Sequence, residues 1–183
     1  MYHHFGFDDN DIEKIRQIDS TFKVYGAKSK DIIIEKDNSN SIVRINEINY
    51  ECNNLVLVEG KQPENKNEML MEYGINESQN INIGDVLEID GKKIKIVGSA
   101  LSTEFLIKSR MVDSRGTSNL GDGRVSFCLF ANKDYFDFDY YTNAYIIDEK
   151  AKDLKINSTE YKDTLKKDKD SLNEVKEKIE TEK

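Results

Sequence analysis

Apolar residues recur at helical spacing soon after the start of the chain. In residues 8–22 the apolar positions lie three or four residues apart, at Ile12, Ile15, Ile18 and Phe22. This spacing places them on one stripe and predicts an amphipathic helix. Asp8 or Asp9 fits its N-cap, because aspartate side chains accept hydrogen bonds from the first free backbone N–H groups of a helix.

Between residues 22 and 147 the pattern changes to short apolar runs separated by Asn, Asp, Ser and Gly, which is typical of strands joined by turns. The Asp90–Gly91 pair between two such runs predicts a tight hairpin. We expect 55–58 to be a short buried strand and 125–130 to be buried on both faces. One helical turn is expected over 73–80, a turn over 37–40 and irregular structure over 102–124. The expected strands are 22–25, 32–36, 41–48, 55–58, 69–72, 86–89, 93–97, 125–130 and 140–147.

The final segment, residues 159–183, has a thin apolar seam in a highly charged sequence. Leu165, Leu172 and Ile179 are seven residues apart, and Tyr161, Asp168 and Val175 repeat in the neighbouring register. This heptad pattern predicts a helix about 37 Å long. Two interpretations remain open: a solvated C-terminal helix, or a stalk whose seam meets a partner helix in a coiled coil. The candidate partner-binding residues are Tyr161, Leu165, Leu172, Val175 and Ile179.

Composition narrows the function classes. The chain has 183 residues, 37% hydrophobic and 34% charged, with a formal net charge of −8. This charge argues against nucleic acid and against an anionic membrane surface as partners. The longest apolar runs, such as Leu55–Val58, are far shorter than the ~20 residues that span a bilayer. Residues 1–5 lack the basic and apolar regions of a signal peptide, so we expect other sequence to direct any export.

No catalytic constellation can be recognised. His3 and His4 are the only histidines and lie at the N-terminus, where a terminal addition is favoured over a metal site. A serine or cysteine nucleophile would therefore have no histidine base in the body of the chain, and a histidine-based zinc site is equally unsupported. We predict no catalytic residues.

No cofactor or metal site is predicted either. The Gly-rich loop 116–123 suggests a phosphate cradle, but Asp122 stands where a P-loop has its lysine. The acidic runs 8–11 and 134–139 lack the central glycine and terminal glutamate of a calcium loop, which favours capped turns.

Cysteine usage leaves one question open. Cys52 and Cys128 lie far apart in sequence and both occur in apolar, strand-like contexts. Two buried thiols and a single disulfide are both compatible with this pattern.

Several segments resemble a known family when taken in order. The stretch Leu57–Met69 is similar to the L-x-x-G-R-x-P-x-x-x-N-E-apolar signature in the extracytoplasmic domain of MacB/FtsX-type ABC transporter permeases. Asn82–Leu87 resembles the family's G-D turn, and Lys93–Gly98 resembles its I-V-G strand. Ser114–Gly121 looks like a loop of the Gram-positive members, and Asp11–Ile15 matches the early helix.

The resemblance implies an α+β fold built from two small subdomains, with one inserted in the other. On this basis we expect 1–57 and 126–157 to form the outer, mixed part. Residues 58–125 would form the inserted, β-rich part, and 158–183 would add the charged heptad helix or stalk.

The resemblance also implies a function. Such a domain, of the MacB-like periplasmic core type, is not an enzyme. It lies between membrane helices of a multi-pass permease, on the outer face of a bacterial membrane, here of Gram-positive type. A cytoplasmic ATPase subunit hydrolyses ATP, and the permease, often a homodimer, transmits the movement outward. This mechanotransmission serves transport of a drug or peptide, peptide resistance, or action on a lipoprotein or envelope protein. The alternatives are a freestanding secreted binding or adhesion module with a helical stalk, or an enzyme with acidic catalytic residues.

Overall fold

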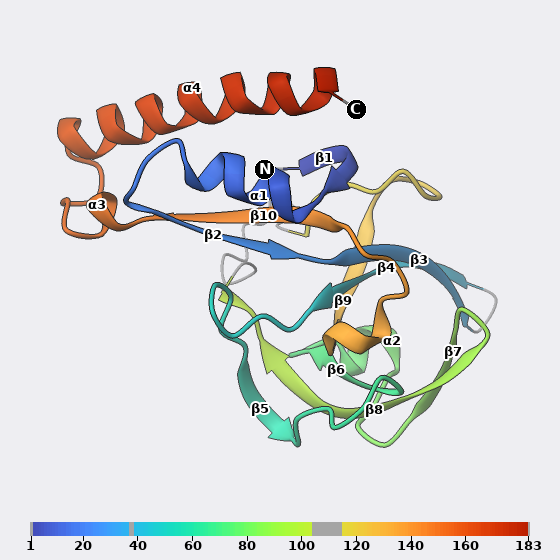
Figure 1. Cartoon of the computed structure of the whole chain (residues 1–183). Helices are drawn as coiled ribbons and strands as arrows, with labels where there is room; N and C mark the ends of the chain where they lie inside the picture. Colours follow the sequence, from blue (N-terminus) through green and yellow to red (C-terminus); the bar gives the residue numbers. More distant parts are fainter. Residues whose placement is uncertain (1, 37–38, 104–114, 183) are drawn as a thin grey trace. The chain divides into compact units, whose positions relative to one another are not determined.

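The computed structural model describes residues 2–36, 39–103 and 115–182, and the chain divides into two compact units. Unit 1 comprises residues 1–27 and 138–183, and unit 2 comprises residues 28–137. Both helices and sheets are present, which confirms the predicted α+β class with a C-terminal helix. Figure 1 labels these elements along the chain.

Unit 1 is a three-stranded antiparallel sheet with helices packed against it. The strand order is β1-β10-β2, so the last strand lies between the first two. Its elements are β1 (Tyr2–Phe7), α1 (Asp9–Arg16), β2 (Phe22–Ala27), β10 (Tyr141–Asp148), α3 (Glu149–Lys152) and α4 (Thr159–Glu182).

Helix α1 begins as predicted and ends earlier than predicted. Asp8 caps it in a reciprocal box with Asp11, each side chain accepting from the other residue's backbone N–H. The helix stops at Arg16, not at residue 22, because Asp19 closes a turn by accepting from both the N–H and the hydroxyl of Thr21. Asp and Thr side chains that bond nearby backbone compete with helix in this way. Phe22 therefore belongs to β2.

Helix α4 confirms the predicted C-terminal helix, and its seam packs on unit 1 itself. Ile179 is fully buried in the core of the unit, and Leu172 and Val175 pack against that core. The helix is thus not a projecting stalk in this structure. A heptad seam specifies an apolar stripe but not what covers it, and here the covering surface is the sheet and α1. The buried core consists of Phe7, Ile12, Ile15, Phe22, Val24, Ala144 and Ile179.

Unit 2 is a seven-stranded mixed sheet. The strand order is β3-β4-β9-β6-β8-β5, with β7 also paired to β8. The β4–β9 and β6–β8 pairs are parallel, and the others are antiparallel. The strands are β3 (Ser29–Lys36), β4 (Ser39–Glu47), β5 (Val56–Gly60), β6 (Glu68–Glu72), β7 (Val86–Ile89), β8 (Lys92–Leu101) and β9 (Val125–Ala131), with α2 (Asn76–Gln79) and the 3-10 helix η2 (Lys133–Tyr135).

The hairpin predicted at Asp90–Gly91 is confirmed. Both residues have positive φ, 53° and 70°, as a type I′ turn requires, and Ile89 pairs with Lys92. The strands expected on either side of the 37–40 turn also pair with each other, as β3 and β4. Of this turn, residues 37 and 38 lie outside the described part.

Strand β5 differs from the prediction of a buried strand. It is the edge strand of the sheet, and Val56 and Val58 are 56% and 44% exposed. Leu57 points to the opposite face and packs against the core. Strand β9, by contrast, lies inside the sheet and is buried on both faces, as predicted.

The limits of the units differ from the predicted domain boundaries. The predicted limits lay at 57/58 and 125/126, whereas the units divide at 27/28 and 137/138. The parallel pairing of β4 with β9 joins these two strands to the sheet that also contains β6 and β8. Strands β4 and β9, which were expected in the outer part, thus lie in the same sheet as β6 and β8, which were expected in the inserted part.

Candidate functional site

The C-terminal seam is distributed between core and surface. Ile179 is 0% exposed, and Leu172 and Val175 are partly buried, so these three serve the interior of unit 1. Leu165 is 42% exposed, and Tyr161 is half-buried. Of the predicted partner-binding residues, Leu165 is therefore the most accessible.

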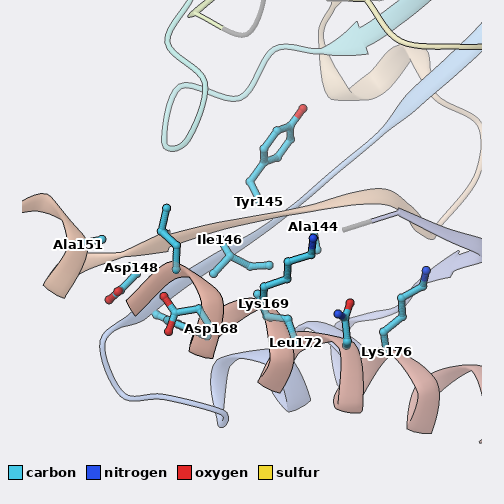
Figure 2. A pocket seen from close by; sticks show the side chains of 12 residues that line it. Ala144, Tyr145, Ile146, Asp148, Ala151, Asp168, Lys169, Leu172 and Lys176 are labelled. Atoms are coloured by element: carbon cyan, nitrogen blue, oxygen red, sulfur yellow. The ribbon is translucent and has the colours of Figure 1, made fainter. Parts of the chain in front are cut away.

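A groove of about 540 Å³ lies between α4 and strand β10 within unit 1. Figure 2 shows Asp168, Lys169, Leu172 and Lys176 of the helix facing the strand. The floor is mostly apolar, and carboxylates gather at one end. The lining includes Phe22, Ala144, Ile146, Asp148, Leu165 and Leu172.

Two carboxyl groups meet at the acidic end of this groove. Asp148 ends β10 and caps α3 through its Oδ1, which accepts from the Lys150 N–H at 2.9 Å and from the Thr21 hydroxyl at 3.0 Å. Its Oδ2 and the Oδ2 of Asp168 are shielded from solvent and receive no donor from the described residues. Burial and the neighbouring Asp148 raise the pKa of Asp168 above its usual value.

An ion pair lies beside these carboxyl groups. The Lys150 ammonium is 2.6 Å from Asp19 Oδ2. This hydrogen bond, with those from Thr21, lowers the pKa of Asp19 to about 2. The pair joins the turn before β2 to α3, and its ammonium group also interacts electrostatically with Asp148 and Asp168.

In unit 2, the segment that resembles the permease signature has a structural role. Gly60 ends β5 with φ +84°, and a Cβ placed there would lie 2.6 Å from the Cα of Gly98. Gly98 belongs to the second resembling segment and pairs directly with Gly60. The two glycines therefore permit backbone contact that larger residues would prevent.

The rest of the signature forms the connection from β5 to β6. Glu68 accepts from the Glu64 N–H and pairs with Lys61 at 3.4 Å. The Pro63 carbonyl accepts from the Asn132 side chain at 2.9 Å. These contacts fix the conformation of the connection. The polar groups involved bind other groups of the same unit.

The third resembling segment is a turn held by β8. The Asn82 N–H donates to the Asp85 carboxylate at 2.9 Å. The Gly84 N–H donates to the Ile96 carbonyl at 2.7 Å, and the Ile96 N–H donates to the Asp85 carbonyl at 2.9 Å. The hydrogen bonds of Gly84 and Asp85 thus fix the position of this turn along β8.

The Gly-rich loop is held by arginine rather than open to phosphate. Arg44 pairs with Asp31 through two hydrogen bonds of 2.7 and 2.8 Å. Its remaining donors reach the carbonyl oxygens of Arg115 and Thr117. Arg115 in turn forms a bidentate pair with Glu72 at 2.8 Å. Since these guanidinium donors are occupied, they anchor the start of the loop to the sheet.

The acidic segment 134–139 contributes a further internal contact. Asp90 accepts from Lys30 at 2.7 Å and from the buried Tyr135 hydroxyl at 3.1 Å. Burial tends to raise the pKa of Asp90, but these two donors outweigh it and the net shift is downward. Burial and Asp90 together raise the pKa of Tyr135.

Metal-ligating side chains do not cluster in the described part of the chain: no three His, Cys, Asp or Glu residues come together there. His3 and His4 fall within β1, and their side chains lie outside what the structure describes. Within the same described ranges, no helix has the length and hydropathy to cross a bilayer.

The two cysteines are not joined by a disulfide in this structure. Cys128 is buried in β9, and this burial raises the pKa of its thiol. Cys52 is half-buried.

Sequence reasoning missed the residues that act through distant partners. Arg44 and Arg115 gave no signal, because the carbonyl oxygens and carboxylates that they bind come from other segments. Asp168 did carry a signal, since a carboxylate in a heptad register is a polar group on an apolar stripe. Its partner Asp148 was not predicted.

No family model matches the chain, and no curated protein matches it. Several solved structures are similar. The extracellular domain of the noncanonic ABC-type transporter YknZ from Gram-positive bacteria has a TM-score of 0.48 and 13% identity, covering 80% of this chain and 75% of that one. The periplasmic region of MacB from Actinobacillus actinomycetemcomitans has a TM-score of 0.47 and 10% identity, covering 96% and 76%. A domain of a protein described as a permease from Porphyromonas gingivalis has a TM-score of 0.34 and 12% identity, covering 75% and 61%. All three are parts of transporter or permease proteins.

Proposed function

We propose that the chain is a non-catalytic, extracytoplasmic domain of an ABC transporter permease. One observation carries this proposal: the segments that resemble the family occupy positions at which the fold of unit 2 requires those residue types. Gly60 and Gly98 come from two different segments and meet in a backbone contact that larger residues would disrupt. If the short motifs resembled the family only by chance, there would be no reason for glycines from two of them to lie in contact.

The charged groups also support a structural rather than a catalytic role. In unit 2, Arg44, Arg115 and Glu72 bind loop or strand partners within the same unit. An acid–base catalyst needs a group directed at a substrate position. The carboxylates of Asp31, Glu72 and Asp90 instead bind groups of the same unit.

The proposed role is to couple cytoplasmic ATP hydrolysis to movement outside the membrane. A bound nucleotide would bias the membrane part of a multi-pass permease toward one arrangement, and this domain would shift between two arrangements in response. The cytoplasmic partner is then an ATPase subunit, and a second permease copy completes a homodimer. The external partner is a peptide, a lipoprotein or an envelope protein.

Within this proposal, the start of α4 is the candidate contact surface. Leu165 and the half-buried Tyr161 are accessible on the helix, whereas Ile179 is used internally. A partner segment would therefore meet the N-terminal half of the helix.

Location can be tested with the full coding sequence expressed in cells. The half-buried native thiol is removed with Cys52→Ser while Cys128 stays buried, and a new thiol is placed at an exposed position of β7 with Glu88→Cys. A membrane-impermeant maleimide should label the variant in intact cells. Labelling only after lysis would contradict the extracytoplasmic location. Carbonate-washed membranes should retain the protein; release into the medium would favour the secreted binding module.

Coupling can be tested in the same membranes. A cysteine at Leu165, again with Cys52→Ser, should react at different rates in ATP-trapped and nucleotide-free transporter. The Glu88→Cys variant serves as the control on unit 2 and reports general changes in reagent access. Equal rates at Leu165→Cys in both states would argue against a coupled movement of α4.

A further inference from the structure

We propose that Asp148 and Asp168 form a proton-operated latch, which holds the N-terminal half of α4 on unit 1 and loosens as the pH rises. The latch is defined by these two carboxyl groups, one at the end of β10 and the other on α4. It does not depend on the proposed function.

The geometry brings together two acceptors without a donor. Asp148 Oδ2 and Asp168 Oδ2 are each shielded from solvent, and neither receives a hydrogen bond from the described residues. Both side chains lie at the same end of the groove in Figure 2. Two ionised carboxylates in such contact repel each other, whereas one shared proton turns the contact into a strong O–H···O hydrogen bond.

The surroundings decide which group carries the proton. Asp148 Oδ1 already accepts from the Thr21 hydroxyl and the Lys150 N–H, so this carboxyl group is held in place as an acceptor. The Oδ2 atom of Asp168 receives no such donor from the described residues. Asp168 is therefore the donor and Asp148 Oδ2 the acceptor.

Other charged groups also act on this contact. Asp19 adds negative charge and favours protonation of Asp168, while Lys150 opposes it. Lys150 is itself paired with Asp19 at 2.6 Å, which reduces its effect. Glu149 is paired with Lys23 and Lys152. Lys169, on α4 itself, lines the same groove and adds a positive charge there. The net result is that burial and Asp148 raise the pKa of Asp168.

The rest of α4 explains why only one half responds. Its C-terminal half is held by the fully buried Ile179 and by the ion pair between Glu182 and Lys14 of α1. Its N-terminal half has the exposed Leu165 and no fully buried side chain among its described residues. Loss of the shared proton therefore acts where apolar anchoring is weakest.

The way in which docking of α4 depends on pH follows from the linkage between docking and proton binding by Asp168. A carboxyl group whose pKa is higher in the docked state than in the free state binds its proton more tightly when docked. Docking is strongest at acidic pH and weakens as the pH rises from about 3.8 through the raised pKa of Asp168. The docking equilibrium constant falls about tenfold for each unit by which that pKa is raised.

NMR on the full 183-residue chain tests the latch. The carboxyl carbon shift of Asp168 reports its titration. Amide protection factors over residues 161–172, corrected for the intrinsic exchange rate at each pH, report docking. In the wild type, both should change together. The Asp168→Asn variant carries a permanent donor to Asp148 Oδ2, so its protection should not vary with pH in this range.

A matched control is Asp163→Asn, which removes the same charge from an exposed position on the same helix. It should follow the wild type. The proposal is overturned if Asp168 titrates at or below 3.8, or if Asp168→Asn shows the same pH dependence as the wild type. The wild-type titration alone decides the matter if the variant does not fold.

Discussion

Gly60 and Gly98 lie opposite each other on β5 and β8, so close that a Cβ on Gly60 would stand 2.6 Å from the Cα of Gly98. This contact holds the edge strand against its neighbour and lets the chain turn directly from β5 into the loop that leads to β6. The Lys61 N–H then donates to the Val97 carbonyl at 3.0 Å.

The Gly98→Ala substitution should destabilise unit 2. The new methyl group would lie 2.6 Å from the Glu59 carbonyl oxygen and 2.9 Å from Leu70 Cδ2. Overpacking of this kind costs about 1–3 kcal/mol. Gly60→Ala should cost more, about 3 kcal/mol, because strain at positive φ adds to the clash. Urea unfolding measures both.

The control for these substitutions is Gly74→Ala. Gly74 also has a positive φ, +85°, but nothing lies within 4 Å of the added methyl group. It should cost only the backbone strain, about 1–2 kcal/mol. Equal losses for all three variants would show that close packing of Gly60 on Gly98 is unimportant.

The Arg44→Ala substitution should loosen the Gly-rich loop and destabilise unit 2 by about 1–3 kcal/mol. It removes two bonds to Asp31 and two to loop carbonyl oxygens, and a hydrogen bond to a charged group contributes a net of about 1.5–3 kcal/mol. Hydrogen exchange over residues 115–124 and urea unfolding measure the effect. Arg124→Ala, at an exposed position of the same loop, should change stability by about 0.5 kcal/mol or less. A similar loss for both would refute the anchoring role.

The Asp19–Lys150 pair should make the contact between the β2 turn and α3 sensitive to strong acid. The pKa of Asp19 is lowered to about 2 by Lys150 and Thr21. The stabilising contribution of the ionised Asp19 is fully present above pH 3.8, its ordinary pKa, and is lost as the pH falls through about 2. NMR titration of the Asp19 carboxyl group measures this.

In the Lys150→Gln variant, the pKa of Asp19 should move back toward 3.8. Lys152→Gln is the matched control, because Lys152 pairs with Glu149 instead. An unchanged titration of Asp19 in Lys150→Gln would assign the shift to Thr21 alone.

The Ile179→Ala substitution should destabilise unit 1 by about 2–4 kcal/mol, since it leaves a cavity in the core beneath α4. Leu165→Ala, in the same seam but 42% exposed, should cost far less. Thermal unfolding followed by circular dichroism compares the two. Equal effects would mean that the seam is not anchored at its C-terminal end.

Local features of this fold could be predicted because their causes are local. Asp90–Gly91 selects a tight turn through two positive φ values, and Asp8 caps α1 through a side chain three residues from its partner. The continuous apolar run of β9 indicated a strand covered on both faces, and the structure confirms it.

Features that depend on distant partners could not be predicted in the same way. The run at 55–58 is apolar enough for an interior strand, but β5 has a neighbour on one side only and exposes Val56 and Val58. The seam of α4 indicated an apolar stripe but not that Ile179 would meet the core of its own unit. Asp168 could be noticed, but its role depends on Asp148 and Thr21.

The strand order has a consequence for how the protein is made. The central strand β9 pairs with β4 and β6, both synthesised long before it, and β10 closes the sheet between β1 and β2. Contacts that join remote parts of a chain slow folding, because loop closure must precede the energy gained. Neither unit can complete its sheet until the ribosome has passed residue 131 for unit 2 and residue 148 for unit 1. Until then β4 and β6 each lack one neighbouring strand, and β1 and β2 lack their common partner β10, which makes this interval the stage most exposed to misfolding.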